Sequence, residues 1–364
     1  MSVFSFTRNP IARVETLAQQ KREPLGRLRR GLDLALMVFL SLLSLLLVAL
    51  EMAAAAWRLD ITDLIDRLTP VIQVYLLLVI LQHFRVMFGT LAQGVAALER
   101  ERRSTERWDT LMMTGITSRE VVLGKWWALL RARWRAYAWL ALWRAGAALW
   151  TGAAFSRALM RVMFATTNYN ASSVNIEIAV PTPLHFLLAA LLIGVLTMMN
   201  LLFTTACALF AGIAYRRAAL AAAFVARILF SCFFGGAASA VLFGLSIVYA
   251  ILNPGMNFPA QIPTPLLNLY ASFGGALGSL FDNGATMAIN LVSYSYSYNP
   301  NATSGVLLWG VELGTLLTTI LSTLLTTFLA AALYAGVTKF ALRQAQLEAE
   351  KLGALKTSEA KGKR

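Results

Sequence analysis

Cysteine and histidine are almost missing from this sequence of 364 residues, which contains two of each. A fold held together by disulfides and a zinc site built from Cys and His both need more of these residues, so both classes are excluded. Charged residues are scarce as well, at 14%, against the roughly 25% that is usual in soluble domains. Hydrophobic residues make up 58%, which leaves too few polar side chains to cover a water-soluble fold of this length. These shortages predict a membrane protein and no metal site.

Long apolar stretches take up most of the chain. A helix needs about 20 predominantly apolar residues to cross the hydrocarbon core of a bilayer. Six stretches have this length: Leu34–Ala56, Pro70–Leu91, Ala136–Phe155, Leu184–Ala214, Ala218–Leu252 and Gly305–Thr338. The sequence therefore predicts an all-α polytopic membrane protein with six transmembrane helices.

Lysine and arginine are distributed unevenly between the segments that connect these stretches. Residues 1–33, 92–135, 215–217 and 339–364 hold 7, 9, 2 and 7 basic residues, whereas the segments on the other side hold four. Basic residues are enriched on the cytoplasmic side of membrane proteins. We therefore expect both termini to be cytoplasmic, with an N-terminal segment 1–33, a membrane domain 34–338 and a basic tail 339–364.

Three charged residues interrupt otherwise apolar spans: Glu51, Arg144 and Glu312. An ionisable group inside the membrane is costly unless it is paired or faces water. Arg144 lies near the middle of its span, and the two glutamates lie toward the outer ends of theirs. A structural ion pair of Arg144 with one glutamate and the lining of an export path are both open interpretations.

Three further basic residues belong to predicted spans. Arg85 and Arg227 lie near the inner ends, where their long side chains can extend to the membrane surface. For His83, a packed or hydrogen-bonded imidazole is the expected role, ahead of proton transfer.

The predicted outer segment 253–304 is rich in Pro, Gly and Asn. It nevertheless contains two apolar pieces, Leu266–Phe281 and Ala285–Val292, each too short to cross a bilayer. Helices that lie on the membrane surface and helices that re-enter the membrane are both compatible with this pattern.

The predicted cytoplasmic segment 99–125 has more pattern than an ordinary linker. Charged residues crowd its first part, and Trp108, Leu111 and Met112 then follow at helical spacing. This spacing predicts a short amphipathic turn whose apolar face needs a partner. Gly115 can end the turn, because glycine accepts the left-handed conformation of a helix end.

A second helix is expected directly after this turn. Thr117 or Ser118 has the side chain of an N-cap, and Glu120 follows in the first turn, where a carboxylate satisfies free backbone amides. The segment therefore predicts helix, break and helix outside the membrane.

At these residues the chain resembles the ABC type-2 permeases, which are membrane subunits of ATP-binding-cassette exporters. The matching pattern is Trp-Asp-x-Leu-x-x-Thr-x-Ile-Thr-x-x-Glu-Val-Val-x-Gly-Lys, from Trp108 to Lys125. A second patch, Asn9-Pro10-Ile-x-x-x-Glu15, resembles the N-terminal amphipathic helix of that family. Asn9 is a good N-cap, and proline suits the first helical position. The resemblance also covers the predicted layout of six spans.

The resemblance implies that segment 99–125 carries a coupling helix that docks into a separate ATPase subunit. The implied coupling residues are Trp108, Asp109, Leu111, Met112, Thr114, Gly115, Ile116, Thr117, Glu120, Gly124 and Lys125. A complex of two permease subunits and two ATPase subunits is implied as well. Because basic residues are frequent nearby, a helix lying on anionic membrane lipids is the alternative.

ATP hydrolysis is not expected in this chain. A Walker A loop needs Gly, four residues, Gly-Lys and then Ser or Thr, but Arg119 occupies the first glycine position and Trp126 follows Lys125. ATP and Mg²⁺ would bind to the partner ATPase, so we expect no cofactor in this chain and a transport subunit, not an enzyme.

The cell membrane of a prokaryote is the expected location. A membrane-embedded lipid-modifying enzyme and a non-transport scaffold subunit are the alternatives. Tryptophans interleaved with arginines between residues 126 and 150 fit membrane-interface anchoring better than nucleic-acid binding. The sequence leaves the substrate open, and also whether the second permease subunit is identical.

Overall fold

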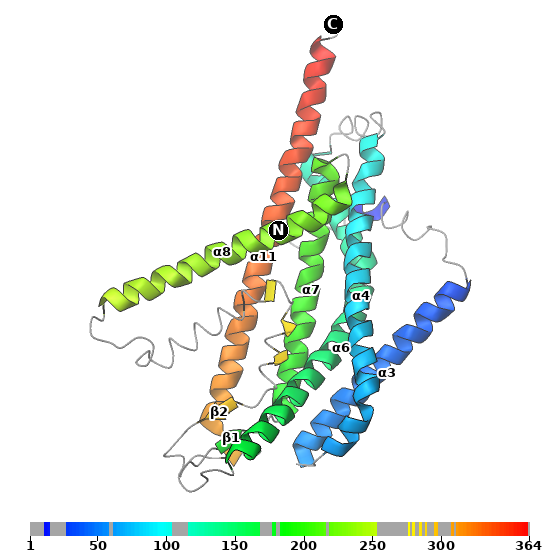
Figure 1. Cartoon of the computed structure of the whole chain (residues 1–364). Helices are drawn as coiled ribbons and strands as arrows, with labels where there is room; N and C mark the ends of the chain where they lie inside the picture. Colours follow the sequence, from blue (N-terminus) through cyan, green and yellow to red (C-terminus); the bar gives the residue numbers. More distant parts are fainter. Residues whose placement is uncertain are drawn as a thin grey trace.

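The computed structural model describes residues 11–14, 27–57, 61–103, 116–167, 177–179, 183–215, 218–252, 276, 279–280, 284–285, 288–289, 295–297, 307–308 and 311–362. Its long helices are α3 (Arg27–Trp57), α4 (Thr62–Arg103), α6 (Ser118–Thr167), α7 (Pro183–Ala214), α8 (Ala219–Leu252) and α11 (Leu313–Gly362). The chain is thus a helical bundle, as the sequence predicts (Figure 1).

Four short strands accompany the helices. β1 (Glu177–Ala179) pairs with β2 (Ser295–Ser297), and β3 (Leu307–Leu308) pairs with β4 (Val311–Glu312), both antiparallel. The second pair corrects the expected start of the last span, because its backbone groups bond within a ribbon and the helix begins only at Leu313. Glu312 therefore lies in a strand in front of α11, not inside the span.

Within the part of the chain that the structure describes, four helices are long and apolar enough to cross a membrane. Their apolar parts are Asp33–Ala54, Arg67–Ala97, Pro183–Ala214 and Ile320–Lys351. The third predicted span lies in α6, whose arginines lower its hydropathy, and the described apolar part of α8, Ala219–Gly235, is shorter than a span. The structure therefore shows four candidate spans, and the other two stay predictions.

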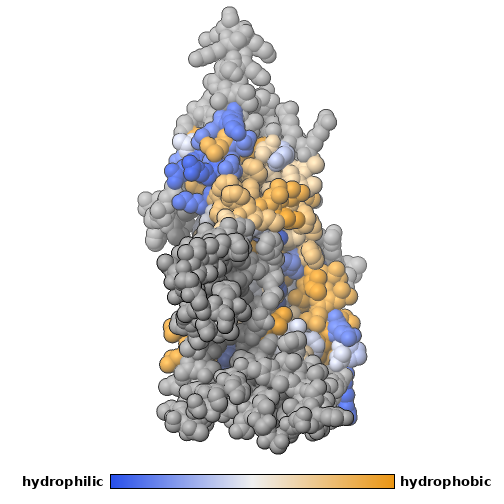
Figure 2. Space-filling model, turned by 60° about the vertical axis from the view of Figure 1, so that its left-hand side comes forward, coloured by the Kyte–Doolittle hydropathy of each residue, from blue (hydrophilic) through white to orange (hydrophobic). Residues whose placement is uncertain are grey.

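Apolar side chains are exposed along these helices. Leu42, Leu77, Leu187, Leu229 and Phe328 are each more than half exposed. Figure 2 shows such surface as an orange band with blue, hydrophilic patches above it and at its lower edge. Apolar surface of this extent needs a non-aqueous environment, so the fold is that of a membrane-embedded protein.

Helix α7 is the centre of the bundle. It packs against α4, α6, α8 and α11, and its contacts include buried small polar residues such as Thr197, Asn200 and Thr204. Small and polar residues allow helices to approach closely and to bond across a membrane interface. A Cβ added to Gly94 of α4 would collide with the Cβ of Ala208 in α7, so two backbones lie unusually close there.

A hydrogen-bonded junction joins α3, α4 and α6. Tyr75 donates from its hydroxyl to the Trp143 carbonyl oxygen at 2.8 Å and lies 2.7 Å from the Ser44 hydroxyl. The Trp143 indole donates to Ser41 at 3.0 Å. Gly146 makes room for this junction, because a Cβ there would lie 2.6 Å from the Tyr75 oxygen. The first three helices of the membrane domain are thereby fixed to one another.

The described residues between 276 and 289 are inserted into the bundle. Leu280 is 1% exposed, and Tyr334 of α11 donates a hydrogen bond to the Ser279 carbonyl oxygen at 2.7 Å. Gly284 has a φ of +82°, and a Cβ at this position would collide with Leu196 of α7. Because Leu196 and Tyr334 lie near the middle of their apolar stretches, this geometry favours re-entrant pieces over surface-lying ones.

Candidate coupling region and intramembrane cavity

A capping box begins α6. The Thr117 hydroxyl oxygen accepts the Glu120 backbone N–H at 3.3 Å, and the Glu120 carboxylate accepts both the Thr117 backbone N–H and its hydroxyl at 2.9 Å. Thr117, and not Ser118, is thus the N-cap of the predicted second helix. The backbone and then the side chain of Thr117 hold the pKa of Glu120 below its ordinary value, because both bonds stabilise the carboxylate.

Lys125 is buried inside the chain. Its side chain is 1% exposed and donates from Nζ to the Ala97 carbonyl oxygen of α4 at 2.8 Å. Gly124 beside it is buried too. The resemblance implies that this pair belongs to the coupling residues, and the structure places the Lys125 side chain in the contact between α4 and α6. In this conformation the Lys125 side chain therefore cannot contact a partner protein directly.

The start of α6 belongs to the largest hydrophobic cluster of the molecule. Val121 and Val122 are fully buried in it, and Ile116 packs against it. The same cluster includes Ala345 and Ala349 of α11, and Ile11 packs against it. The predicted basic tail is thus continuous with α11 to Gly362, and its first turns pack against the bundle.

Several predicted coupling residues lie outside the described residues. These are Trp108, Asp109, Leu111, Met112, Thr114 and Gly115. Asn9, Pro10 and Glu15, which were predicted for the N-terminal helix, lie outside the described residues as well. The described neighbours of the N-terminal patch, residues 11–14, are helical, with Ala12 buried and Val14 exposed.

Arg144 and Glu51 are both buried, at 9% and 3% exposure. Arg144 of α6 donates from Nη1 to the Thr197 hydroxyl of α7 at 2.7 Å. This hydroxyl is a partner that the sequence analysis did not identify, since it considered only carboxylates. Thr197 is one of many threonines in apolar helices, so no local signal distinguishes it.

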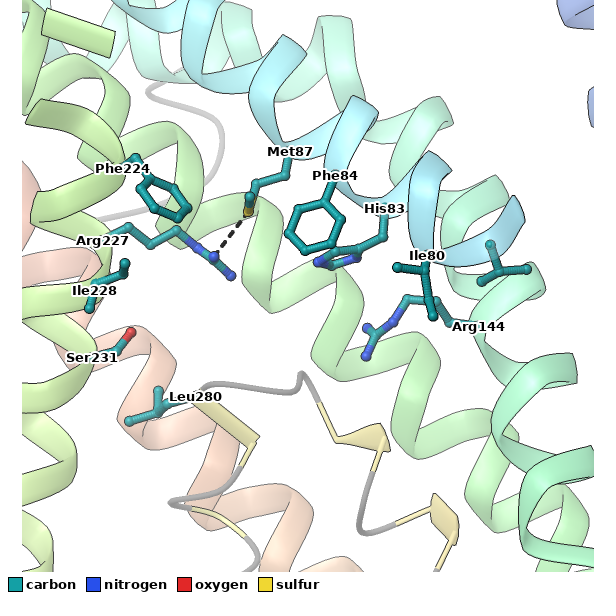
Figure 3. A pocket seen from close by; sticks show the side chains of 11 residues that line it. Ile80, His83, Phe84, Met87, Arg144, Phe224, Arg227, Ile228, Ser231 and Leu280 are labelled. Carbon is teal, nitrogen blue, oxygen red and sulfur yellow. Dashed lines mark hydrogen bonds between the residues drawn. The ribbon is translucent and has the colours of Figure 1, made fainter. Parts of the chain in front are cut away.

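A cavity of about 420 Å³ lies beside Arg144 (Figure 3). It is formed by α4, α6 and α8, with Leu280 closing one side. Its lining residues are Val79, Ile80, His83, Phe84, Met87, Arg144, Phe224, Arg227, Ile228, Ser231 and Leu280. Three basic side chains from three helices therefore border one otherwise mostly apolar space.

Arg227 does not have the role that the sequence suggested. Instead of extending to the membrane surface, it lines the cavity and donates to the Asn200 amide oxygen at 2.8 Å and to the Met87 sulfur at 3.0 Å. Arg85 is half exposed and forms an ion pair with Asp33 at 2.8 Å.

Polar atoms near the cavity lack partners among the described residues. They are Nδ1 of His83, Nε of Arg227 and Nδ2 of Asn200, all buried. The sequence predicts a packed or hydrogen-bonded imidazole: Nδ1 has no hydrogen bond among the described residues, and the ring packs edge-on against Phe84. Among the described residues there is also no group of three or more His, Cys, Asp or Glu side chains that could hold a metal ion.

Comparison with known proteins finds no matching family model, no matching curated protein and no matching solved structure. The resemblance to ABC type-2 permeases thus rests on the residues quoted from the sequence.

Proposed function

We propose that this chain is the membrane-spanning permease subunit of an ATP-driven exporter of the ABC type-2 class. It would work in the cell membrane of a prokaryote, with six spans and both termini in the cytoplasm. A second permease subunit and separate ATPase subunits would complete the transporter. The ATPase subunits would bind ATP and Mg²⁺.

The observation that carries the proposal is the contact between α4 and α6 on either side of residues 104–115. Lys125 joins α6 to Ala97 of α4, and beyond this contact α4 runs to Arg103 while α6 begins at Ser118. Each helix thus extends roughly 10 Å past the contact, at 1.5 Å per residue. Residues 104–115, which contain Trp108 and Met112, connect these two helix ends in the sequence.

This geometry supports a lever. Force applied by an ATPase to residues 104–115 would reach α4 and α6 together, because the Lys125–Ala97 bond and the packing around Gly94 join these helices to α7. The end of α4, the beginning of α6 and the C-terminal half of α11 also lie at the same end of the molecule, uppermost in Figure 1. These are segments for which the sequence predicts a cytoplasmic location.

A double substitution tests the proposal. Trp108→Ala with Met112→Ala removes two of the three apolar anchors of the predicted turn, and losing one such anchor typically costs about 2 kcal/mol or more of binding. We expect the ATPase subunit to be lost on copurification, or to stay bound without responding to the permease. Yield and insertion of the permease should be retained, because these residues lie outside the predicted spans.

Charge reversal at Arg102, Arg103 and Arg107 is the matched comparison. A helix that only lies on anionic lipid would depend on these charges and on salt, and not on the apolar anchors. If the arginine variant loses ATPase association and transport while the Trp108/Met112 variant keeps both, the coupling role is wrong. If neither variant changes ATPase activity, the result favours the alternative of a non-transport scaffold subunit.

A further inference from the structure

We infer that the cavity between α4, α6 and α8 binds the phosphate headgroup of an anionic membrane lipid. Figure 3 shows Arg227 reaching in from α8, opposite His83 of α4 and Arg144 of α6. The sequence pattern that points to a coupling region does not include any of these three residues. Such a lipid would bind whether or not the chain works with an ATPase, so the site goes beyond the proposed function.

The first argument is charge. Among the described residues, the Arg227 guanidinium has only neutral hydrogen-bond partners, the Asn200 amide oxygen and the Met87 sulfur. A cation within a membrane protein is costly unless an anion or water compensates it. Arg227 lies about 12 Å along α8 from Ala219, at 1.5 Å per residue, so it is well inside the helix. A bound anion supplies the missing compensation.

The second argument is hydrogen bonding. Nε of Arg227 and Nδ2 of Asn200 are buried donors without an acceptor among the described residues. Leaving a buried donor unpaired is costly, and more so for a charged group. A ligand that bonds these two donors must therefore supply acceptor oxygens. A phosphate offers several, and the planar guanidinium of arginine matches phosphate geometry in two-bond contacts.

The third argument distinguishes a lipid from a free ion. Most of the cavity lining is aliphatic or aromatic, and Ile80, Phe84 and Ile228 are each 43–54% exposed on the outside of the bundle. The polar groups thus lie behind an apolar rim that faces the membrane. A volume of about 420 Å³ is within the roughly 300–1,000 Å³ of small-molecule sites. Such a site fits a headgroup inside and acyl chains outside.

The test measures lipid binding to the purified full-length chain by native mass spectrometry. Phosphatidylglycerol is compared with diacylglycerol of the same acyl chains, which has no phosphate. We expect phosphatidylglycerol to bind at least about tenfold more tightly, because charge-assisted bonds distinguish the two. Arg227→Gln should reduce this preference by about tenfold. Arg85→Gln should leave it unchanged, because that side chain is exposed and its loss removes the same charge outside the cavity.

A measurement on the unaltered chain covers the case in which Arg227→Gln does not fold. A photoactivatable phosphatidylglycerol should crosslink to peptides containing residues 80–87 and 224–231, and excess unlabelled lipid should suppress the labelling. Displacement by millimolar inorganic phosphate would overturn the lipid assignment. Three results would overturn the assignment of the cavity as the lipid site. They are equal binding of both lipids, labelling only outside these peptides, and an Arg227→Gln variant whose preference for phosphatidylglycerol is unchanged.

Discussion

Lys125 of α6 donates from its ammonium group to the carbonyl oxygen of Ala97 in α4, at 2.8 Å and with 1% of the lysine exposed. A buried ammonium is retained only when its donors are bonded. The contact lies close to the end of α4 at Arg103 and to the start of α6 at Ser118. A lysine at the end of the sequence motif is therefore a brace between two helices.

Replacing this lysine should weaken the brace. Lys125→Met keeps the length and the apolar stem but loses the charged bond, so we expect a loss of about 1–3 kcal/mol in stability, seen as a lower thermal midpoint of monodisperse protein. Lys351→Met is the control, because Lys351 is exposed and its bond to Glu348 is a surface pair. Equal midpoints for the two variants would contradict the brace.

The close approach of α4 and α7 gives a second prediction. Gly94→Ala places a Cβ against Ala208 and 3.0 Å from the Leu129 side chain. Overpacking of this kind typically costs about 1–3 kcal/mol. Adding Ala208→Gly removes the obstructing methyl group and should restore most of the thermal midpoint. Gly194→Ala is the control, since nothing lies within 4 Å of its added Cβ. A Gly94→Ala variant as stable as Gly194→Ala would contradict the packing.

The capping box predicts a pH dependence. Because its bonds to Thr117 lower the pKa of Glu120, the carboxylate stabilises the start of α6 fully above the ordinary glutamate pKa. This stabilisation is lost as the pH falls through the lowered pKa. Hydrogen exchange of the first turn of α6 should therefore be faster in Glu120→Gln than in the unaltered chain at pH 7. The difference should shrink below about pH 4.

Thr117→Ala removes the other half of the box and should cost about 1 kcal/mol of helix stability. Thr117→Ser is the control, because serine keeps the hydroxyl. If Thr117→Ser and Thr117→Ala open the first turn equally fast, the hydroxyl has no capping role.

Local features of the fold were predictable because they depend on neighbours in the sequence. An N-cap at Thr117 or Ser118 followed from a hydroxyl just before Glu120, with the structure selecting Thr117, and the helices followed from apolar runs. Contacts between distant segments gave no such signal. Arg144 bonds Thr197, 53 residues away, and Arg227 bonds Asn200 instead of extending to the membrane surface. Glu312 pairs in a strand with Leu307 because a local ribbon ends before the helix begins.

Membrane orientation is the last prediction. Single cysteines at positions 63, 170 and 301 should react with an impermeant thiol reagent added to intact cells, and those at Ser104 and Ser358 should react only after lysis. The reason is the concentration of basic residues in the segments that contain Ser104 and Ser358.

The experiment needs a protein in which both native cysteines are replaced. Cys232 is exposed on α8, and Cys207 is fully buried in α7, where alanine is the smallest change in packing. Labelling of Ser104→Cys or Ser358→Cys in intact cells, with positions 63, 170 and 301 protected, would reverse the orientation. Such a result would also remove residues 104–115 from the reach of any cytoplasmic ATPase, so the proposed coupling would be lost with the topology.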